Sequence, residues 1–131
     1  MELQLSPEDR KNARTIMARC GFRNVYLDRD VEVLLNWWVD FVNESTSTLW
    51  IDRESFVEDL GIRSAIQVLL DGLRNRVSTA MAAQIAEADE RYRSAPRREE
   101  GFLLDAKLLA QYPQEIYFWL YGVPETVQFT E

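Results

Sequence analysis

The chain has 131 residues, with 22 acidic side chains against 15 basic ones, a formal net charge of −7, one cysteine and no histidine. The lack of histidine excludes Ser-His-Asp and Cys-His catalysis, imidazole general bases and every histidine-ligated metal site. The single cysteine, Cys20, excludes an intrachain disulfide and suits a reducing compartment, and the negative charge disfavours binding to nucleic-acid phosphates.

The first predicted element is a helix over residues 7–20. Ser6 followed three residues later by Asp9 is a capping-box pattern, in which each residue satisfies a backbone amide of the other. Gly21 can take the left-handed conformation that commonly ends a helix. The apolar stripe of this helix includes Cys20, so we expect a buried and unreactive thiol.

The most apolar stretch, residues 30–43, predicts a buried hub helix. In a helix its polar residues fall on one narrow stripe, because they recur at spacings of four, four and three: Glu32, Asn36, Asp40 and Asn43. The rest of the circumference is apolar, and a helix of this kind is normally enclosed by other elements. We therefore expect this helix to be the centre of the core, or half core and half interface.

The middle of the chain predicts one short helix and one long helix. Asp52 is a suitable N-cap for the short helix, and Gly61 stands where a C-terminal glycine cap would lie. Ser64 and Gln67 then form a second capping-box pattern. An apolar stripe with helical spacing follows, so we expect a single long helix over about residues 64–93.

The last third of the chain contains two further helical patterns. A charged loop at residues 94–101 precedes a helical pattern at 102–112, and the apolar segment 113–121 predicts a C-terminal helix that packs on the hub helix. The segment 126–129 has strand-like composition, as does 24–27, so these two segments could form a minor two-stranded pairing.

Together these elements predict a single all-α domain over residues 1–131, with five or six helices. No apolar run approaches membrane-spanning length, and the opening residues lack the positive charge and apolar run of a secretory signal. We therefore expect a cytoplasmic protein that does not enter a membrane.

Three aromatic residues are candidates for a protein-binding surface: Trp37, Trp119 and Tyr121. Trp37 lies off the main apolar stripe of its predicted helix, and Trp119 and Tyr121 point different ways around theirs, so one helical face cannot bury all of them. Tryptophan and tyrosine dominate interface hot spots, which favours a partner protein or self-association. The alternative is that neighbouring helices enclose these rings within the core.

Four arginines form the one dense basic group, and they are candidates for anion binding: Arg91, Arg93, Arg97 and Arg98. The first pair falls in the last turn of the predicted long helix, where cations complement the helix dipole. A phosphate or an acidic partner could dock there. Two glutamates follow immediately, so the alternative is a solvated loop that pairs with itself.

Other chemistry finds little support in the residue pattern. The alternating acids Asp28, Asp30 and Glu32 resemble the start of a calcium loop, but the required glycine and distal glutamate are missing. Acidic helices offer many carboxylate pairs without marking one as catalytic. We therefore predict no metal, no cofactor and no assigned catalytic residue.

Three functions remain open. The first is a non-catalytic protein-binding module of the antitoxin, immunity or adaptor kind, which uses its acidic surface and exposed aromatics. The alternative is a small enzyme or ligand-binding domain, with a pocket between the hub and C-terminal helices lined by Trp37 or Trp38, Tyr117 and an arginine. The third is a helix-turn-helix DNA binder over residues 52–73, which the net charge opposes.

Overall fold

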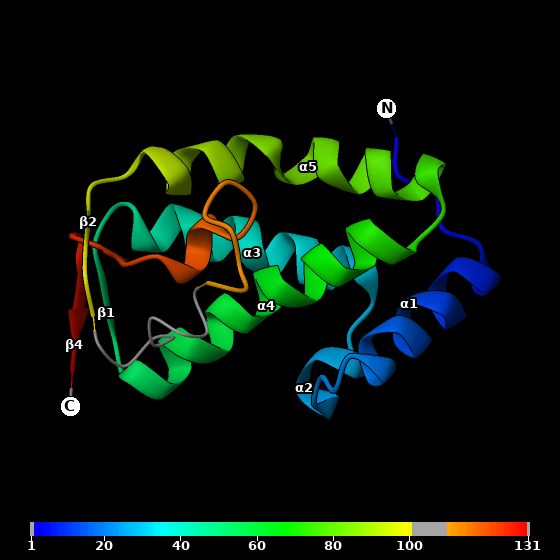
Figure 1. Cartoon of the computed structure of the whole chain (residues 1–131), viewed down its shortest axis with the longest axis horizontal. Coiled ribbons are helices and arrows are strands. Elements are labelled where there is room, and N and C mark those ends of the chain that lie inside the picture. The colour runs from blue at the N-terminus through cyan, green and yellow to red at the C-terminus, as the bar shows by residue number, and fades with distance from the viewer. Residues whose placement is uncertain (1, 101–109, 131) are drawn as a thin grey trace.

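The computed structural model describes residues 2–100 and 110–130 (Figure 1). Its helices are α1 (Pro7–Arg19), α2 (Asn24–Leu27), α3 (Val31–Ser45), α4 (Arg53–Gly72), α5 (Asn75–Ser94) and the 3-10 helix η1 (Phe118–Leu120). Its strands are β1 (Leu49–Ile51), β2 (Arg97–Arg98), β3 (Val123–Pro124) and β4 (Val127–Phe129). The prediction of an all-α domain with five or six helices is confirmed, since the strands form only two short pairs.

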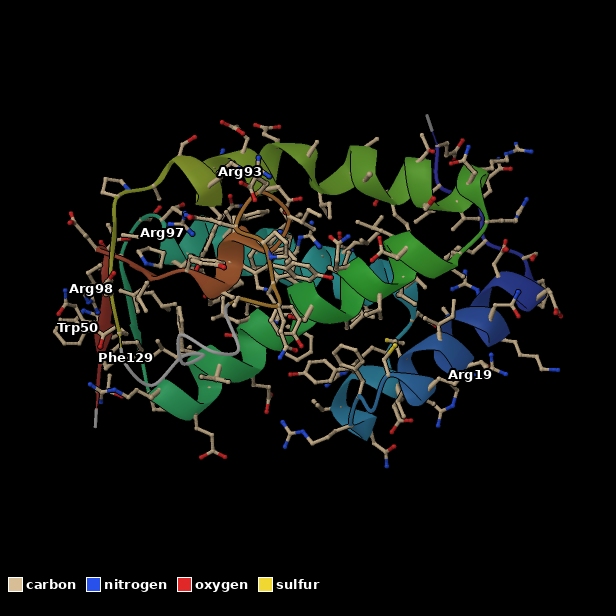
Figure 2. All side chains as sticks on the ribbon, viewed as in Figure 1. Arg19, Trp50, Arg93, Arg97, Arg98 and Phe129 are labelled. Carbon is tan, nitrogen blue, oxygen red and sulfur yellow. The ribbon has the colours of Figure 1, made fainter. Side chains whose placement is uncertain are left out.

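The helices pack around α3, which contacts both α4 and α5, while α1 packs against α4. Figure 1 shows α1 and α2 at one end of the molecule and the short strands at the other. In the all-atom view, Arg19 accordingly lies far from Trp50 and Phe129 (Figure 2). No helix within the described residues is long and apolar enough to cross a membrane.

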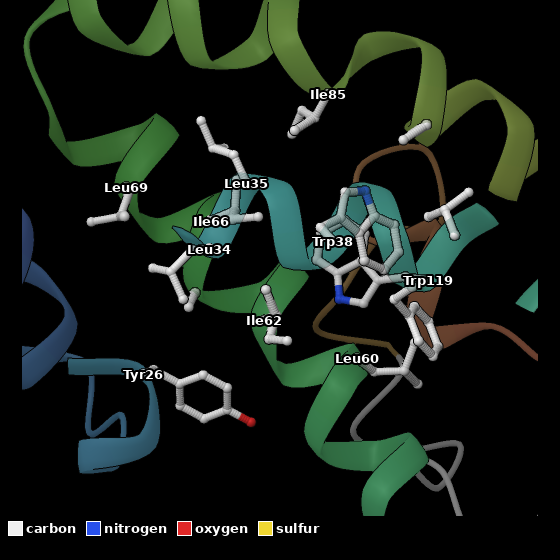
Figure 3. Close-up of a cluster of buried hydrophobic side chains, with 14 of the residues drawn as sticks. Tyr26, Leu34, Leu35, Trp38, Leu60, Ile62, Ile66, Leu69, Ile85 and Trp119 are labelled. Carbon is white, nitrogen blue, oxygen red and sulfur yellow. The ribbon is translucent and has the colours of Figure 1, made fainter. Parts of the chain in front are cut away.

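The predicted hub helix is confirmed as α3. Its buried side chains come from Val31, Leu34, Leu35, Trp38, Phe41, Val42 and Ser45. Figure 3 shows part of this set surrounded by side chains of α4 and α5. The helix is not enclosed on all sides, however, because Val33 is 44% exposed and Trp37 is half-buried. The face that carries these two residues is turned toward solvent.

The capping box of α1 is present and also fixes a distant corner of the fold. The Ser6 hydroxyl accepts from the Asp9 amide at 3.1 Å, and the Asp9 carboxylate accepts from the Ser6 amide at 2.9 Å. Arg74, between α4 and α5, donates to both oxygens of Asp9 at 2.8 and 2.9 Å. These hydrogen bonds lower the pKa of Asp9 and hold the corner between α4 and α5 against the start of α1.

The single long helix predicted over 64–93 is wrong. The chain forms two helices of 20 residues, α4 and α5, separated by an extended Leu73. The two helices contact each other and both pack on α3, so one straight helix could not bury both apolar stripes. The predicted break at Gly61 is also wrong, because α4 continues through it. A Cβ there would lie 2.2 Å from the Tyr26 hydroxyl, so the glycine permits close packing rather than ending a helix.

The predicted pairing of 24–27 with 126–129 is wrong in one of its two segments. The first segment forms the short helix α2, whose Tyr26 is buried and donates its hydroxyl proton to the Glu58 carbonyl at 2.9 Å. The second segment contains β4, but β4 pairs in parallel with β1, with Trp50 opposite Gln128. A second, antiparallel pair joins β2 to β3.

The predicted C-terminal helix over 113–121 is reduced to a turn and η1. The Pro113 carbonyl accepts from the amides of Ile116 and Tyr117, and η1 then carries Phe118 and Trp119 into the core. Burying adjacent aromatic rings in this way suits one tight turn better than an amphipathic helix. Most of the helix predicted at 102–112 lies outside the described residues. Cys20 is exposed, so the expected buried thiol is also wrong.

Tyr92 offers a test of the core packing. Its ring is fully buried, and its hydroxyl is the one buried side-chain polar atom among the described residues without a hydrogen-bond partner. An unsatisfied buried hydroxyl costs roughly 1–3 kcal/mol, so we expect Y92F to raise the free energy of unfolding by about 1 kcal/mol in urea denaturation. The matched control is Y26F, which removes a hydroxyl that does donate and should lower stability by about as much. Equal losses from both variants would contradict the assignment.

Candidate protein-binding surface

The exposed face of α3 carries a groove of about 400 Å³, which we call the α3 groove. Five residues line it: Arg29, Val33, Asn36, Trp37 and Asp40. Four of them lie on α3 at spacings of three, one and three residues, so they share one side of the helix. The groove therefore combines an apolar centre with one carboxylate, one amide and one guanidinium at its edges.

The Trp37 ring is held in position by two polar partners. Its indole nitrogen donates to Asp59 Oδ1 of α4 at 3.1 Å. On the other side, the Arg29 guanidinium lies 5.6 Å from the ring centroid, within the range of a cation–π contact. The ring is thus oriented before any partner arrives, which lowers the entropy cost of binding.

Burial raises the pKa of Asp59 to about 6, and the neighbouring acids Glu58, Glu44 and Asp52 add to this effect. The hydrogen bond from Trp37 acts in the opposite direction, because it stabilises the ionised carboxylate. The fold therefore destabilises the ionised form of Asp59, the same carboxylate that orients Trp37.

This raised pKa predicts a pH-dependent stability. Between about pH 4 and pH 6 the folded state holds the Asp59 proton more tightly than the unfolded state, so stability from this group falls as the pH rises through that window. D59N removes the charge and keeps an oxygen for Trp37. We expect D59N to match the wild type near pH 4 and to be more stable by roughly 1–2 kcal/mol at pH 7.5, after allowing for solvent screening at this half-exposed group.

Urea denaturation across pH 4–8 measures this difference. E87Q is the control, since it removes one negative charge from a side chain that is 91% exposed, and its difference from wild type should not change in the same window. A D59N difference that is constant with pH would contradict the prediction.

The three aromatic residues predicted as a binding surface are not brought together. Trp119 is fully buried, where its indole nitrogen donates to the Ser64 hydroxyl at 2.9 Å. Tyr121 is half-buried, and its hydroxyl donates to the Tyr112 carbonyl at 2.6 Å. Trp119 is therefore part of the core, as the alternative interpretation held, and only Trp37 lies in a surface groove.

The four arginines predicted to bind an anion each have partners within the chain. Arg91 bonds to Asn43, and Arg93 pairs with Glu90. Arg97 donates to the Phe118 carbonyl. The Arg98 guanidinium donates to carbonyls of β3 and β4 and pairs with Glu100. Arg97 and Arg98 thus do not form a loop that pairs only with itself, because their bonds to distant carbonyls hold the C-terminal segment to the end of α5.

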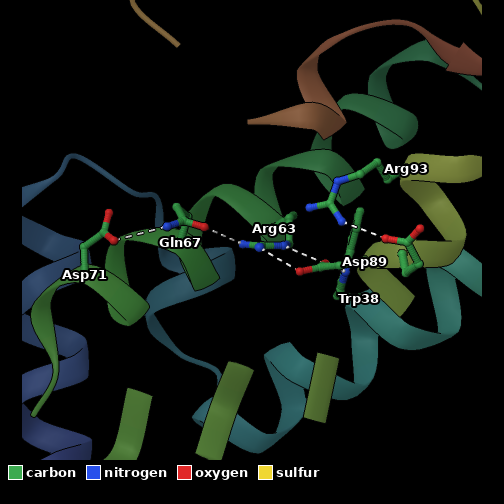
Figure 4. A network of polar contacts seen from close by, with 7 residues as sticks. Trp38, Arg63, Gln67, Asp71, Asp89 and Arg93 are labelled. Atoms are coloured by element: carbon green, nitrogen blue, oxygen red, sulfur yellow. Dashed lines mark hydrogen bonds and ion pairs between the residues drawn. The ribbon is translucent and has the colours of Figure 1, made fainter. Parts of the chain in front are cut away.

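A buried ion pair lies where the alternative function required a pocket. Arg63 of α4 donates through Nε and Nη2 to the two carboxylate oxygens of Asp89 on α5, at 3.0 and 2.9 Å (Figure 4). The Trp38 indole nitrogen donates to the same carboxylate at 2.8 Å. The Arg63 guanidinium also stacks on Trp119, 4.4 Å from the ring centroid.

Aromatic rings fill the space between α3, α5 and η1 around this ion pair. The Trp38 ring lies 5.3 Å from Tyr92, Tyr92 lies 6.2 Å from Phe118, and Phe118 lies 5.1 Å from Trp119, all measured between ring centroids. The Arg63 guanidinium is thus enclosed by packed side chains. Its contacts indicate a structural role at the junction of three helices.

Removing Arg63 should be strongly destabilising, because it leaves the Asp89 carboxylate without its cation in a buried site. We expect R63M to cost roughly 3–5 kcal/mol of unfolding free energy, and R63K to restore little, since an ammonium cannot reproduce the two-point contact. R63M/D89N should be more stable than R63M alone. The control R10M breaks the exposed two-point pair between Arg10 and Glu32 and should have a much smaller effect. Equal losses from R10M and R63M in urea denaturation would contradict this role.

A second groove, of about 500 Å³, separates α1 from the start of α3. Its rim includes Arg10 and Arg14, but Arg10 binds both oxygens of Glu32, and Arg14 pairs with Asp28. These ion pairs join α1 to the segment before α3. An anionic ligand would have to compete with carboxylates that are already in place.

Sequence reasoning missed most of the α3 groove. It identified Trp37 but not Val33 or Asp40, although their spacing places all three on one helical face. It also missed Trp50, which is 68% exposed on β1. A signal for Trp50 was present, since alternation along the segment 49–51 puts its side chain opposite Leu49 and Ile51.

Comparison with protein-family models, with curated proteins and with solved structures gave no match. Among the described residues, no cluster of three or more acidic or cysteine side chains is arranged to hold a metal ion.

Proposed function

We propose that this chain is a non-catalytic protein-binding module of the cytoplasm, and that it docks a partner protein in the α3 groove. The observation that carries the proposal is the half-buried ring of Trp37, which lines the groove and is oriented by Asp59. Tryptophan is the residue type most enriched at interface hot spots, and pre-oriented rings bind with a smaller entropy cost.

The partner segment is expected to be apolar with a basic residue beside it. Val33 and Trp37 provide the apolar centre, and Asp40 provides a carboxylate at the edge. Asp59 of α4, which accepts from the Trp37 indole nitrogen, adds a second acidic group next to the Trp37 ring. The net charge of −7 favours association with a basic partner through long-range attraction.

The proposal is tested first by photocrosslinking in the native host. A photoreactive residue at Asn36, which is exposed at the groove and leaves Trp37 intact, should capture one protein reproducibly. The matched control places the same residue at Glu87 on α5, whose side chain is 91% exposed, and should not capture that protein. Loss of capture when W37A is added would tie the product to the groove.

Binding of the captured partner to the purified chain then measures the contribution of each group. We expect W37A to weaken binding by roughly 30-fold or more, as for a hot-spot residue. D40K should weaken binding by about tenfold and make it less sensitive to salt, whereas E87K, with the same charge change elsewhere, should not. A partner that binds W37A and D40K as tightly as wild type, with both variants folded by circular dichroism, would overturn the proposal.

A further inference from the structure

Strand β1 presents the polar groups of Trp50 on the side away from β4. The Leu49 amide donates to the Thr126 carbonyl, and the Thr130 amide donates to the Ile51 carbonyl, both at 3.1 Å. In a parallel ladder the residues that bond to the neighbouring strand alternate with residues whose N–H and C=O point the other way. The register Trp50 to Gln128 therefore directs the Trp50 backbone groups to the outer edge of β1.

The Trp50 side chain is the most exposed large apolar side chain that the structure describes. It is 68% exposed, against 44–50% for Val33, Val57 and Ile116. Figure 2 shows Trp50 at the strand end of the molecule, projecting away from the helices. An edge strand with an exposed aromatic ring and outward polar groups is a template for pairing with another strand.

The other edge of this sheet is already covered. The Arg98 guanidinium donates to the Val127 carbonyl of β4 at 2.8 Å. The same guanidinium lies over the Phe129 ring, with its central carbon 5.7 Å from the ring centroid. Strand addition at β4 would displace this arginine. Pairing is therefore directed to β1, and a pair formed there cannot continue into a growing fibre.

We propose that β1 pairs in antiparallel fashion with β1 of a second copy of this chain, about a two-fold axis through Trp50. Each Trp50 amide then donates to the Trp50 carbonyl of the other copy, and Leu49 lies opposite Ile51 of the second copy. The result is a four-stranded sheet with the order β4–β1–β1–β4. This surface is separate from the α3 groove, so the dimer and the partner-binding function are independent.

The second copy is chosen over another protein because β1 is complementary to itself. In the antiparallel register, Asp52 lies opposite Thr48 and Arg53 lies opposite Ser47, so no two charges of the same sign face each other. A parallel register would place Asp52 against Asp52. The two exposed indoles meet on one face of the new sheet, where aromatic cross-strand pairs are favourable.

The size of the contact predicts a weak dimer. Stable dimers bury about 1,200–2,000 Å² in total, and one three-residue strand with an indole provides less than that. We therefore expect a dissociation constant of roughly 10 μM to 1 mM. At that strength the dimer forms at high local concentration and separates on dilution.

Analytical ultracentrifugation of the full chain from about 1 μM to 1 mM tests the proposal. The wild type should change from monomer to dimer over this range. W50A should weaken the association at least tenfold, and W50P should abolish it, because proline removes the outward amide without disturbing the β1–β4 hydrogen bonds. V57A, which removes an exposed apolar side chain from α4, and W37A, in the α3 groove, should dimerise as the wild type does.

Two results would overturn the proposal. One is a wild type that remains monomeric at every concentration. Capture of a different protein by a photoreactive residue at position 50 would not rescue the proposal in that case. The other is a dimer that W50A and W50P leave unchanged. Sensitivity to W37A alone would place self-association in the α3 groove instead, and would also contradict the assignment of that groove to another protein.

Discussion

The ion pair between Arg63 and Asp89 is the interaction on which the helical packing depends. It joins α4 to α5 inside the core, and Trp38 brings α3 to the same carboxylate. The guanidinium also supports the face of Trp119 in η1. A buried charge must be paired in this way because an isolated one would be prohibitively costly. The pair and its two tryptophans therefore tie α3, α4, α5 and η1 together at one point of the core.

Two further arginine contacts hold the ends of the molecule to this centre. Arg74 donates to both oxygens of the Asp9 carboxylate that caps α1, which holds the start of α1 against the corner between α4 and α5. At the opposite end, Arg98 bonds to the carbonyls of the last strands. Arg74 thus reinforces a carboxylate that already caps a helix, whereas Arg98 satisfies carbonyl oxygens of the short strands β3 and β4. Several arginines of this acidic chain therefore stabilise the fold by bonding to distant parts of the same chain.

The surfaces proposed for recognition follow from this use of charge. Because the arginine group near the end of α5 is paired internally, the features that stand out are aromatic: Trp37 in the α3 groove and Trp50 on the edge of β1. The first is oriented by a carboxylate that the fold itself disfavours in its charged form. The second sits on a strand whose outer polar groups are directed away from the molecule. The partner binding and the self-association proposed above therefore involve different residues of the same scaffold.

The sequence by itself determined the local features: the capping box of α1, the hub helix, the helical class and the absence of histidine chemistry. These depend on residues a few positions apart, where spacing alone decides which groups meet. Only the tertiary structure decided that Gly61 lies within a helix, that β4 pairs with β1, and that Trp119 is core while Trp50 is surface. A glycine needed for a helix end and one needed for a close contact look the same in a sequence. The exposure of a tryptophan is likewise set by whichever distant side chains pack against it.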